Sequence, residues 1–276
     1  MSALPEPAGT APLPPQDSAA LLDVSGVSKR FGGLQALSEV NLRIAAGQVY
    51  GLIGPNGAGK TTFFNVLTGL YTPDAGTFLL GGTPYHPVAV HKVARAGIAR
   101  TFQNIRLFPE MTALENVMVG RHARTRSGLI GAVFRTAAFR AEEAAIAARA
   151  RELLDYVGIG AYAPYRARTL SYGDQRRLEI ARALATEPLL LALDEPAAGM
   201  NATEKTVLRG LIDRIRGDGR TVLLIEHDVK LVMGLCDRVT VLDQGKPIAE
   251  GTPAEVQRNE AVIEAYLGAN HRAVSA

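Results

Sequence analysis

Residues 54–61 read Gly54-Pro55-Asn56-Gly57-Ala58-Gly59-Lys60-Thr61 and match the phosphate-binding pattern G-x-x-x-x-G-K-[ST]. The apolar run Val49 to Ile53 precedes this loop and predicts a buried strand, and Thr62 to Leu67 predicts the first turns of a helix. This context matters because glycines let backbone N–H groups turn inward around phosphate oxygens, while a helix N-terminus adds the positive end of its dipole. The sequence therefore predicts a binding site for ATP or GTP.

Two side chains of the loop have predictable roles. Lys60 is placed to reach the β- and γ-phosphates, and the Thr61 hydroxyl is placed to bind Mg²⁺. Backbone amides of the loop surround the phosphate oxygens. The expected nucleotide contacts are Gly54, Pro55, Asn56, Gly57, Ala58, Gly59, Lys60, Thr61 and Thr62.

Composition predicts a globular chain with no membrane-spanning helix. The 276 residues are 47% hydrophobic, enough for a sizeable core in one large domain or two small ones. No stretch approaches the roughly 18 apolar residues that cross a membrane. Residues 1–20 are rich in proline and contain no Lys or Arg, which predicts a disordered tail rather than a signal peptide. The single cysteine, Cys236, excludes an internal disulfide framework and fits a reducing cytosol.

The charge distribution has one local feature. A net charge of +3 is too small to predict a nucleic-acid partner. Between Glu115 and Glu142 there is no acidic residue, and the stretch contains Arg121, Arg124, Arg126, Arg135 and Arg140. It is either a solvated basic face or a contact with anionic lipid head groups or an acidic partner, and the sequence leaves these alternatives open.

The order of the expected elements indicates an α/β fold. Short strands separated by turn residues extend from Leu21 to about residue 80, and helical character extends from about residue 104 to 169. After Pro188, strands and helices alternate, which predicts a largely parallel sheet with helices on its faces. We expect one domain over residues 21–268, with a helical insertion at about 104–169 and a C-terminal tail at 269–276.

A second apolar run, Leu189 to Leu193, ends in the adjacent acids Asp194 and Glu195. Because α/β sheets bind ligands at the carboxyl ends of their strands, these carboxylates belong beside the phosphate loop. Asp194 is placed to hold Mg²⁺, directly or through water, and Glu195 to polarise the attacking water as a general base. Two adjacent acids could also be ordinary surface residues, but the phosphate loop in the same chain favours the catalytic interpretation.

The hexapeptide Leu170-Ser171-Tyr172-Gly173-Asp174-Gln175 opens a helical run ahead of the acidic strand. Its sequence and the order of the three motifs resemble the ATP-binding-cassette (ABC) superfamily, in which this position carries the signature motif. Ser171 and Gly173 keep the hydroxyl and backbone that would face a γ-phosphate. The departures are Tyr172, where the family commonly has glycine, and Asp174, where it commonly has glutamine. Taken alone, the string could be a helix cap.

The resemblance assigns further residues by position. Gln103, in Arg100-Thr101-Phe102-Gln103, matches the glutamine loop that senses Mg²⁺ and the attacking water. His227 matches the switch histidine that hydrogen-bonds the γ-phosphate. Phe31 takes the position of the aromatic residue that stacks on adenine, although a phenylalanine after a strand packs into a core more often. The residues implied for catalysis are Lys60, Gln103, Glu195 and His227, and those implied for the metal are Thr61, Gln103 and Asp194.

Longer strings are similar to the ATPases of branched-chain (hydrophobic) amino-acid importers. The likeness covers Leu21 to Gly268, and urea, amide and lipopolysaccharide transporters carry related ATPases. The strings are Arg30-Phe31-Gly32-Gly33-Leu34, Asp194-Glu195-Pro196-Ala197-Ala198-Gly199-Met200-Asn201, Ile225-Glu226-His227-Asp228-Val229-Lys230-Leu231-Val232-Met233 and Ala265-Tyr266-Leu267-Gly268.

The resemblance implies an ABC ATPase fold, with a phosphate-loop core, an antiparallel β subdomain and a helical insertion. It further implies a bacterial importer subunit that uses ATP and Mg²⁺ and lies peripherally on the cytoplasmic face of the inner membrane. Its partners would be a second ATPase subunit, identical or different, integral membrane permeases and, indirectly, a periplasmic solute-binding protein. Nucleic acid is not expected. The solute cannot be read from this chain.

Two other classes fit the sequence less well. A soluble ABC protein acting on ribosomes or DNA normally shows a second cassette or long coiled-coil heptads, and this chain has neither. A phosphate-loop kinase has no use for the signature helix. A GTPase needs a guanine-reading N-K-x-D string, which the sequence lacks.

The segment from Asn104 to Met111 is the expected permease contact. It carries Leu107, Phe108 and Met111 close together without a strand or helix period that would bury them all. Clustered apolar side chains of this kind mark a partner surface when they are exposed, with local core packing as the alternative. By resemblance, a cytoplasmic coupling helix of the permease docks here.

Overall fold

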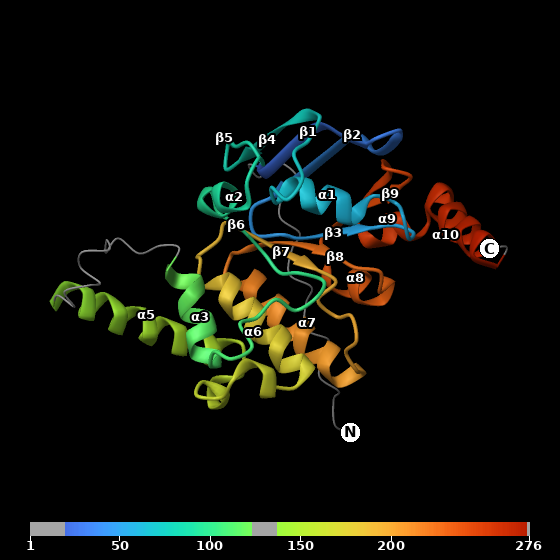
Figure 1. Cartoon of the computed structure of the whole chain (residues 1–276). Coiled ribbons are helices and arrows are strands. Elements are labelled where there is room, and N and C mark those ends of the chain that lie inside the picture. The colour runs from blue at the N-terminus through green and yellow to red at the C-terminus, as the bar shows by residue number, and fades with distance from the viewer. Residues whose placement is uncertain (1–19, 123–136, 275–276) are drawn as a thin grey trace, which may run out of the picture.

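The computed structural model describes residues 20–122 and 137–274, and it contains two sheets with helices between and around them (Figure 1). The outer sheet is antiparallel, in the strand order β2-β1-β4-β5. Alternate side chains of its long strands are buried, among them Leu22 and Val24 in β1 and Leu42 and Ile44 in β2, as a period of two requires. Its strands are β1 (Ala20–Phe31), β2 (Leu34–Ala45), β4 (Ala75–Leu80) and β5 (Thr83–Pro84).

The central sheet has the order β10-β9-β3-β8-β7-β6. The five strands from β9 to β6 pair in parallel, and β10 pairs antiparallel with β9. Every residue of β3, β7 and β8 is buried, because helices or the outer sheet cover both faces. The strands are β3 (Val49–Ile53), β6 (Ile98–Arg100), β7 (Leu190–Asp194), β8 (Thr221–Ile225), β9 (Arg238–Asp243) and β10 (Lys246–Gly251).

Two hydrophobic cores lie on the two faces of the central sheet, and β3 contributes to both. Tyr50 and Leu52 point into the core shared with the outer sheet and α1, whereas Val49 and Ile53 point into the core shared with α6, α7 and α8. Figure 1 shows α1 between the two sheets and these last three helices below the central one. The helices are α1 (Lys60–Leu67), α2 (Val90–Ala96), α6 (Tyr172–Leu184), α7 (Ala202–Gly217) and α8 (Val229–Leu235).

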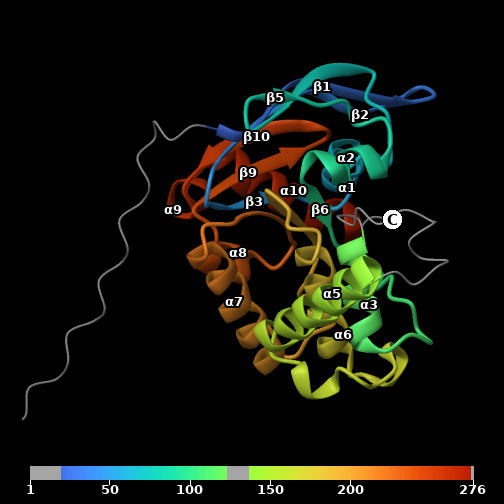
Figure 2. The same ribbon diagram turned by 90° about the vertical axis from the view of Figure 1, so that its left-hand side faces the viewer.

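The remaining helices form an arm and a C-terminal unit. α3 and α5 pack on each other and on α6, and they extend to the left in Figure 1, the side that faces the viewer in Figure 2. α9 and α10 follow β10. Their bounds are α3 (Ala113–His122), α5 (Ala137–Tyr156), α9 (Pro253–Gln257) and α10 (Glu260–Val274), with short 3₁₀ turns η1 (Gly160–Tyr162) and η2 (Ala167–Thr169) between α5 and α6.

The predicted α/β class, the mostly parallel sheet and the antiparallel β subdomain are confirmed. The helical arm begins later than the sequence suggested, because residues 104–112 form loop and turns and α3 begins at Ala113. The reason is Asn116, which is fully buried. Its amide accepts from the Phe108 N–H at 2.9 Å and donates to the Phe108 carbonyl at 3.0 Å, holding this loop in a non-helical path.

Several expectations fall outside the described residues. The proline-rich segment 1–19 lies there, as do Arg124, Arg126 and Arg135 of the arginine stretch. Within the described part, Arg121 forms an ion pair with Glu187 at 2.7 Å. None of the helices in residues 20–122 and 137–274 is long and apolar enough to cross a membrane.

Candidate nucleotide site

The phosphate loop connects the buried strand β3 to helix α1, and two of its glycines are required by space. A side chain at Gly54 would place its Cβ 2.1 Å from the Leu242 carbonyl oxygen. Gly59, the residue before α1, has a φ of 98°. A Cβ at this position would lie 2.9 Å from the Ala36 carbonyl oxygen. Only glycine fits such a close approach combined with a positive φ. The loop therefore leads directly into the N-terminus of α1, where the first N–H groups of a helix have no partner within the helix.

Lys60 lies inside this loop. Only 7% of it is exposed, and its ammonium donates to the carbonyl oxygens of Gly54 at 2.7 Å and Pro55 at 2.9 Å. Burial lowers the pKa of Lys60, while the carboxylates of Glu195 and Asp194 oppose that shift. A buried cation beside a helix N-terminus makes this loop a strong site for a phosphate chain.

Asp194 ends β7 and is 3% exposed. Its pKa is raised to about 6, chiefly by burial, with Glu195 and Glu226 contributing to the rise and Arg100, whose guanidinium is 3.8 Å away, opposing it. A bound cation would offset the free-energy cost of the buried negative charge on Asp194, so this carboxylate fits a role as a Mg²⁺ ligand. In the described part of the chain no cluster of three or more His, Cys, Asp or Glu side chains could hold a metal alone. Mg²⁺ is usually bound through one or two protein carboxylates and substrate phosphates.

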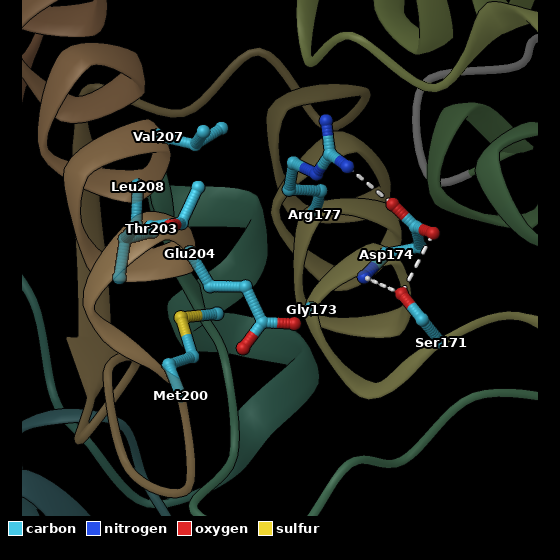
Figure 3. Close-up of a pocket in the computed structure, with 9 residues that line it drawn as sticks. All are labelled: Ser171, Gly173, Asp174, Arg177, Met200, Thr203, Glu204, Val207 and Leu208. Carbon is cyan, nitrogen blue, oxygen red and sulfur yellow. Dashed lines mark hydrogen bonds and ion pairs between the residues drawn. The ribbon is translucent and has the colours of Figure 1, made fainter.

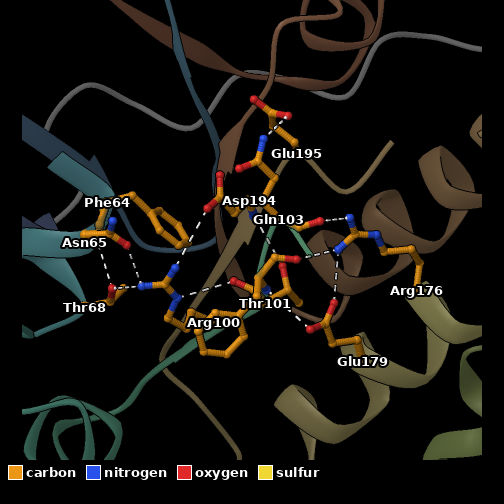
Figure 4. A network of polar contacts seen from close by, with 11 residues as sticks. Phe64, Asn65, Thr68, Arg100, Thr101, Gln103, Arg176, Glu179, Asp194 and Glu195 are labelled. Carbon is orange, nitrogen blue, oxygen red and sulfur yellow. Dashed lines mark hydrogen bonds and ion pairs between the residues drawn. The ribbon is translucent and has the colours of Figure 1, made fainter. Parts of the chain in front are cut away.

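Glu195, Gln103 and His227 come together although they are far apart in the sequence. The Gln103 amide donates to Glu195 Oε2 at 3.0 Å, and His227 Nδ1 lies 3.7 Å from the same oxygen. Figure 4 shows the first of these contacts, with Asp194 beside it. Glu195 has a φ of 46°, in the left-handed region that is unusual for a residue with a side chain, and its N–H donates to the Ile225 carbonyl at 2.9 Å. Such strain often occurs at functional sites.

Ser171 and Gly173 occupy the first turn of α6. The Ser171 hydroxyl accepts from the Asp174 N–H at 3.2 Å and donates to the Asp174 carboxylate at 2.7 Å, while Arg177 forms an ion pair with that carboxylate (Figure 3). A Cβ at Gly173 would lie 2.7 Å from Oε1 of Glu204 on α7, so the two helix starts approach closely. These residues line a cavity of about 230 Å³. In residues 20–122 and 137–274, no hydrogen bond or ion pair links Ser171 or Gly173 to the phosphate loop.

Phe31 ends β1 and does not enter the core. Its side chain is 42% exposed and meets Tyr71 edge to face, with ring centroids 5.2 Å apart and an angle of 76° between the planes. The Lys29 ammonium lies 5.4 Å from the Phe31 ring centroid. An exposed ring supported by a second ring is a suitable surface for stacking a purine.

Four buried or supporting side chains were not identified from the sequence. Arg100 lies between the rings of Phe64 and Phe102, each centroid 4.5 Å from its guanidinium carbon. Glu226 is fully buried and accepts from the Ala197 N–H at 2.9 Å. Arg176 and Glu179 hold the glutamine loop from α6. Arginine and glutamate side chains are usually exposed to solvent, so the sequence gives no reason to expect these four to be buried. Their position between two motifs is the only available signal.

Two family models match the chain. The model for ABC transporters matches residues 37–198, and the model for branched-chain amino acid ATP-binding cassette transporters matches residues 246–272. The high-affinity branched-chain amino acid transport ATP-binding protein BraF of Pseudomonas aeruginosa is 49% identical over 249 residues, which span 90% of this chain and 98% of that protein. The corresponding protein LivG of Escherichia coli (strain K12) is 48% identical with the same coverage.

Solved structures agree. An ATP-binding cassette of an ABC transporter in its ADP conformation superposes with a TM-score of 0.79 at 30% identity, covering 91% of this chain and 100% of that one. A dimeric cassette in a post-hydrolysis state, bound to ADP and Pi, gives a TM-score of 0.71 at 26% identity and covers 84% and 98%. The chain belongs to the ABC transporter ATPase family. Within it, the chain is most similar among these relatives to ATP-binding subunits of branched-chain amino acid transporters.

These matches confirm the family resemblance, the ABC ATPase fold and nucleotide binding by this chain. The roles given to individual site residues stay predictions that the geometry supports.

Proposed function

We propose that this chain is the ATP-hydrolysing subunit of a bacterial importer for branched-chain or other amino acids. It converts ATP and water to ADP and phosphate and couples that reaction to solute movement. The observation that supports this most is the contact of Gln103 with Glu195, 3.0 Å apart, with His227 beside them and Lys60 in the adjoining loop. The branched-chain class is supported by the 48–49% identity to BraF and LivG.

Catalysis by these residues is mainly positioning and charge stabilisation. Lys60 and the loop amides hold the phosphates, and Thr61 and Asp194 would hold Mg²⁺, which neutralises phosphate charge when bound. Glu195 accepts a proton from the attacking water. Gln103 keeps the carboxylate of Glu195 oriented, and by resemblance His227 would hydrogen-bond the γ-phosphate.

The active species in this proposal is a dimer. Ser171, which is exposed, and Gly173, which is buried against Glu204, lie at the start of α6 and make no described hydrogen bond to their own phosphate loop. By resemblance, the phosphate they would face belongs to a second subunit. A dimeric relative with ADP and Pi bound supports this arrangement. The second ATPase can be an identical or a different chain. A dimer working for importer permeases would sit peripherally on the cytoplasmic face of the inner membrane.

A groove beside the glutamine loop is the proposed permease contact. It has a volume of about 350 Å³ and lies between α2, β6, α3 and α6. Phe108 lines it with 45% of its surface exposed, and Arg182 lies 5.9 Å from the Phe108 ring centroid. Met111 is 38% exposed nearby in sequence, whereas Leu107 packs against the core. Exposed aromatic and methionine side chains are common anchors for a partner helix.

Replacement of the proposed general base tests the function. We expect Glu195→Gln to bind ATP with near wild-type affinity and to lose about 10²–10⁴-fold in turnover, because the amide cannot accept the proton. Steady-state phosphate release measures this. Glu250→Gln, on the exposed strand β10, is the matched control and keeps its activity. Release by Glu195→Gln near the wild-type rate would contradict the assignment.

A further inference from the structure

A buried arginine on α6 holds the backbone of the glutamine loop. Arg176 is 1% exposed and is the largest of the fully buried side chains in the described part of the chain. Its Nη1 donates to the Phe102 carbonyl at 2.5 Å, and its Nη2 donates to the Gln103 carbonyl (Figure 4). Arginine is rarely buried unless it is paired, and its planar fork fixes two acceptors in one geometry. The fork therefore sets where the backbone of Gln103 lies.

Glu179, one turn along the same helix, also binds the backbone of the glutamine loop. Its Oε2 accepts from Arg176 Nη1 at 3.2 Å, and its Oε1 accepts from the N–H groups of Phe102 at 3.4 Å and Arg106 at 3.3 Å. The pair thus binds both the carbonyls and the amides of one short loop. Because each charge has its partner, neither is left alone in the core, where an unpaired charge would be costly.

The other side of Arg176 faces the signature segment. Nη2 also approaches the Tyr172 hydroxyl at 3.1 Å, and the guanidinium carbon lies 5.5 Å from the Tyr172 ring centroid. Tyr172 stands between Ser171 and Gly173. At the far end, the Gln103 amide donates to Glu195 at 3.0 Å. A continuous series of hydrogen bonds therefore runs from Tyr172 through Arg176 and Gln103 to Glu195.

We propose that Arg176, supported by Glu179, is a positioning residue that couples the signature segment to the orientation of Gln103 and Glu195 in the same subunit. The inference rests on the proposed ATPase dimer and deepens it, since the signature segment faces the partner's ATP while Glu195 faces the subunit's own. Closure on one nucleotide moves α6, and the buried fork transmits that movement to the loop at the other nucleotide.

The test removes both charges together. Arg176→Met with Glu179→Met removes both charges of the pair and retains apolar volume, a replacement that is often tolerated in cores. Arg182, whose Nη2 lies 3.9 Å from Glu179 Oε1, loses this partner and is part of what the variant changes. We expect kcat to fall about tenfold to a hundredfold, because small misplacements of catalytic groups have effects of this size. ATP affinity of the subunit should stay within about twofold. The control is Arg149→Met with Glu152→Met, an i,i+3 pair of the same chemistry on exposed α5. An unchanged kcat, or an equal loss in the control, overturns the proposal.

The same paired substitution made in the Gln103→Ala variant distinguishes a positioning role from a general loss of structure. If Arg176 and Glu179 act through Gln103, the paired substitution should cost little further activity once Gln103→Ala has removed the amide. If the fold-losses in kcat of the paired substitution and of Gln103→Ala multiply in the combined variant, Arg176 and Glu179 act independently of Gln103, which overturns the inference. Should the paired variant fail to fold, Arg176→Lys decides. Its ammonium keeps the charge but lacks the planar fork that fixes the two carbonyls in one geometry, so an intermediate kcat supports the proposal and a wild-type kcat contradicts it.

Hydrogen exchange gives a readout that needs no turnover. We expect peptides covering residues 102–106 to exchange faster in the paired variant than in the control, because the amides of Phe102 and Arg106 lose their acceptor. Unchanged exchange would overturn the positioning role. A wild-type chain that hydrolyses no ATP would instead contradict the proposed function, and the exchange comparison would still decide this inference.

Discussion

The phosphate loop and the signature segment, residues 170–175, each lie at the N-terminus of a helix, α1 and α6 respectively, yet they differ in what surrounds them. Lys60 interacts electrostatically with Asp194 and Glu195, at the end of β7 in the same chain, and Glu195 is already contacted by Gln103. The Ser171 hydroxyl is occupied by Asp174 on its own helix and reaches no part of that site. One half-site is therefore assembled by folding of this chain, whereas Ser171 is exposed and faces the nucleotide of a second subunit only in the proposed dimer.

The largest expected effect separates these two halves. Lys60→Ala removes the buried cation and should abolish ATP binding by the isolated subunit, because no other cation of the loop can replace it. Ser171→Arg should leave that binding intact and prevent ATP-dependent dimerisation, since a long charged side chain blocks the exposed helix start. Nucleotide titration and light scattering measure the two properties.

Ser25→Arg is the matched control for the second change, because it places the same side chain on the exposed outer sheet. Dimerisation of Ser171→Arg with ATP would contradict the assignment of the signature segment to the partner's nucleotide. Retained ATP binding by Lys60→Ala would contradict the role of the phosphate loop.

A smaller effect is expected at the groove beside the glutamine loop. Phe108→Asp should preserve ATP binding by the isolated subunit but weaken its association with the permease, because a charge replaces an exposed aromatic anchor. Co-purification with the permease measures this, alongside a thermal melt. Leu34→Asp, which is 69% exposed in the outer sheet, is the control and should co-purify normally. Normal co-purification of Phe108→Asp, or a collapsed melting temperature, would end the docking hypothesis.

The sequence predicts the fold well because its motifs coincide with element boundaries. Strand β3 has the bounds expected from the apolar run Val49 to Ile53. Strand order and burial on both faces follow from alternating apolar runs. The non-helical path of residues 104–112 was not predicted, because it depends on hydrogen bonds from the buried side-chain amide of Asn116. Local sequence composition does not reveal such contacts.

The candidate site was predicted in part for a similar reason. Gln103, Glu195 and His227 could be named because each follows or precedes a recognisable string, and the structure brings them together. Arg176 and Glu179 could not, because their spacing of three on a helix equally describes a solvent-exposed ion pair. Which face of α6 is buried depends on tertiary packing that no local pattern records.

The smallest effect concerns the base of the nucleotide rather than its phosphates. Tyr71 supports Phe31 edge to face at 5.2 Å, and such aromatic pairs contribute about 0.5–1.5 kcal/mol beyond buried area. We therefore expect Tyr71→Leu to weaken ATP binding about twofold to tenfold and to leave the binding of inorganic tripolyphosphate, which has no base, unchanged. Isothermal titration with both ligands measures the difference. The control is Tyr165→Leu, which breaks a similar exposed pair with Tyr162, 6.0 Å apart, away from the phosphate loop. Equal weakening for both ligands would mean that Tyr71 supports the loop and not the ring that stacks on adenine. No change for either would show that Phe31 needs no support, or does not meet the base at all.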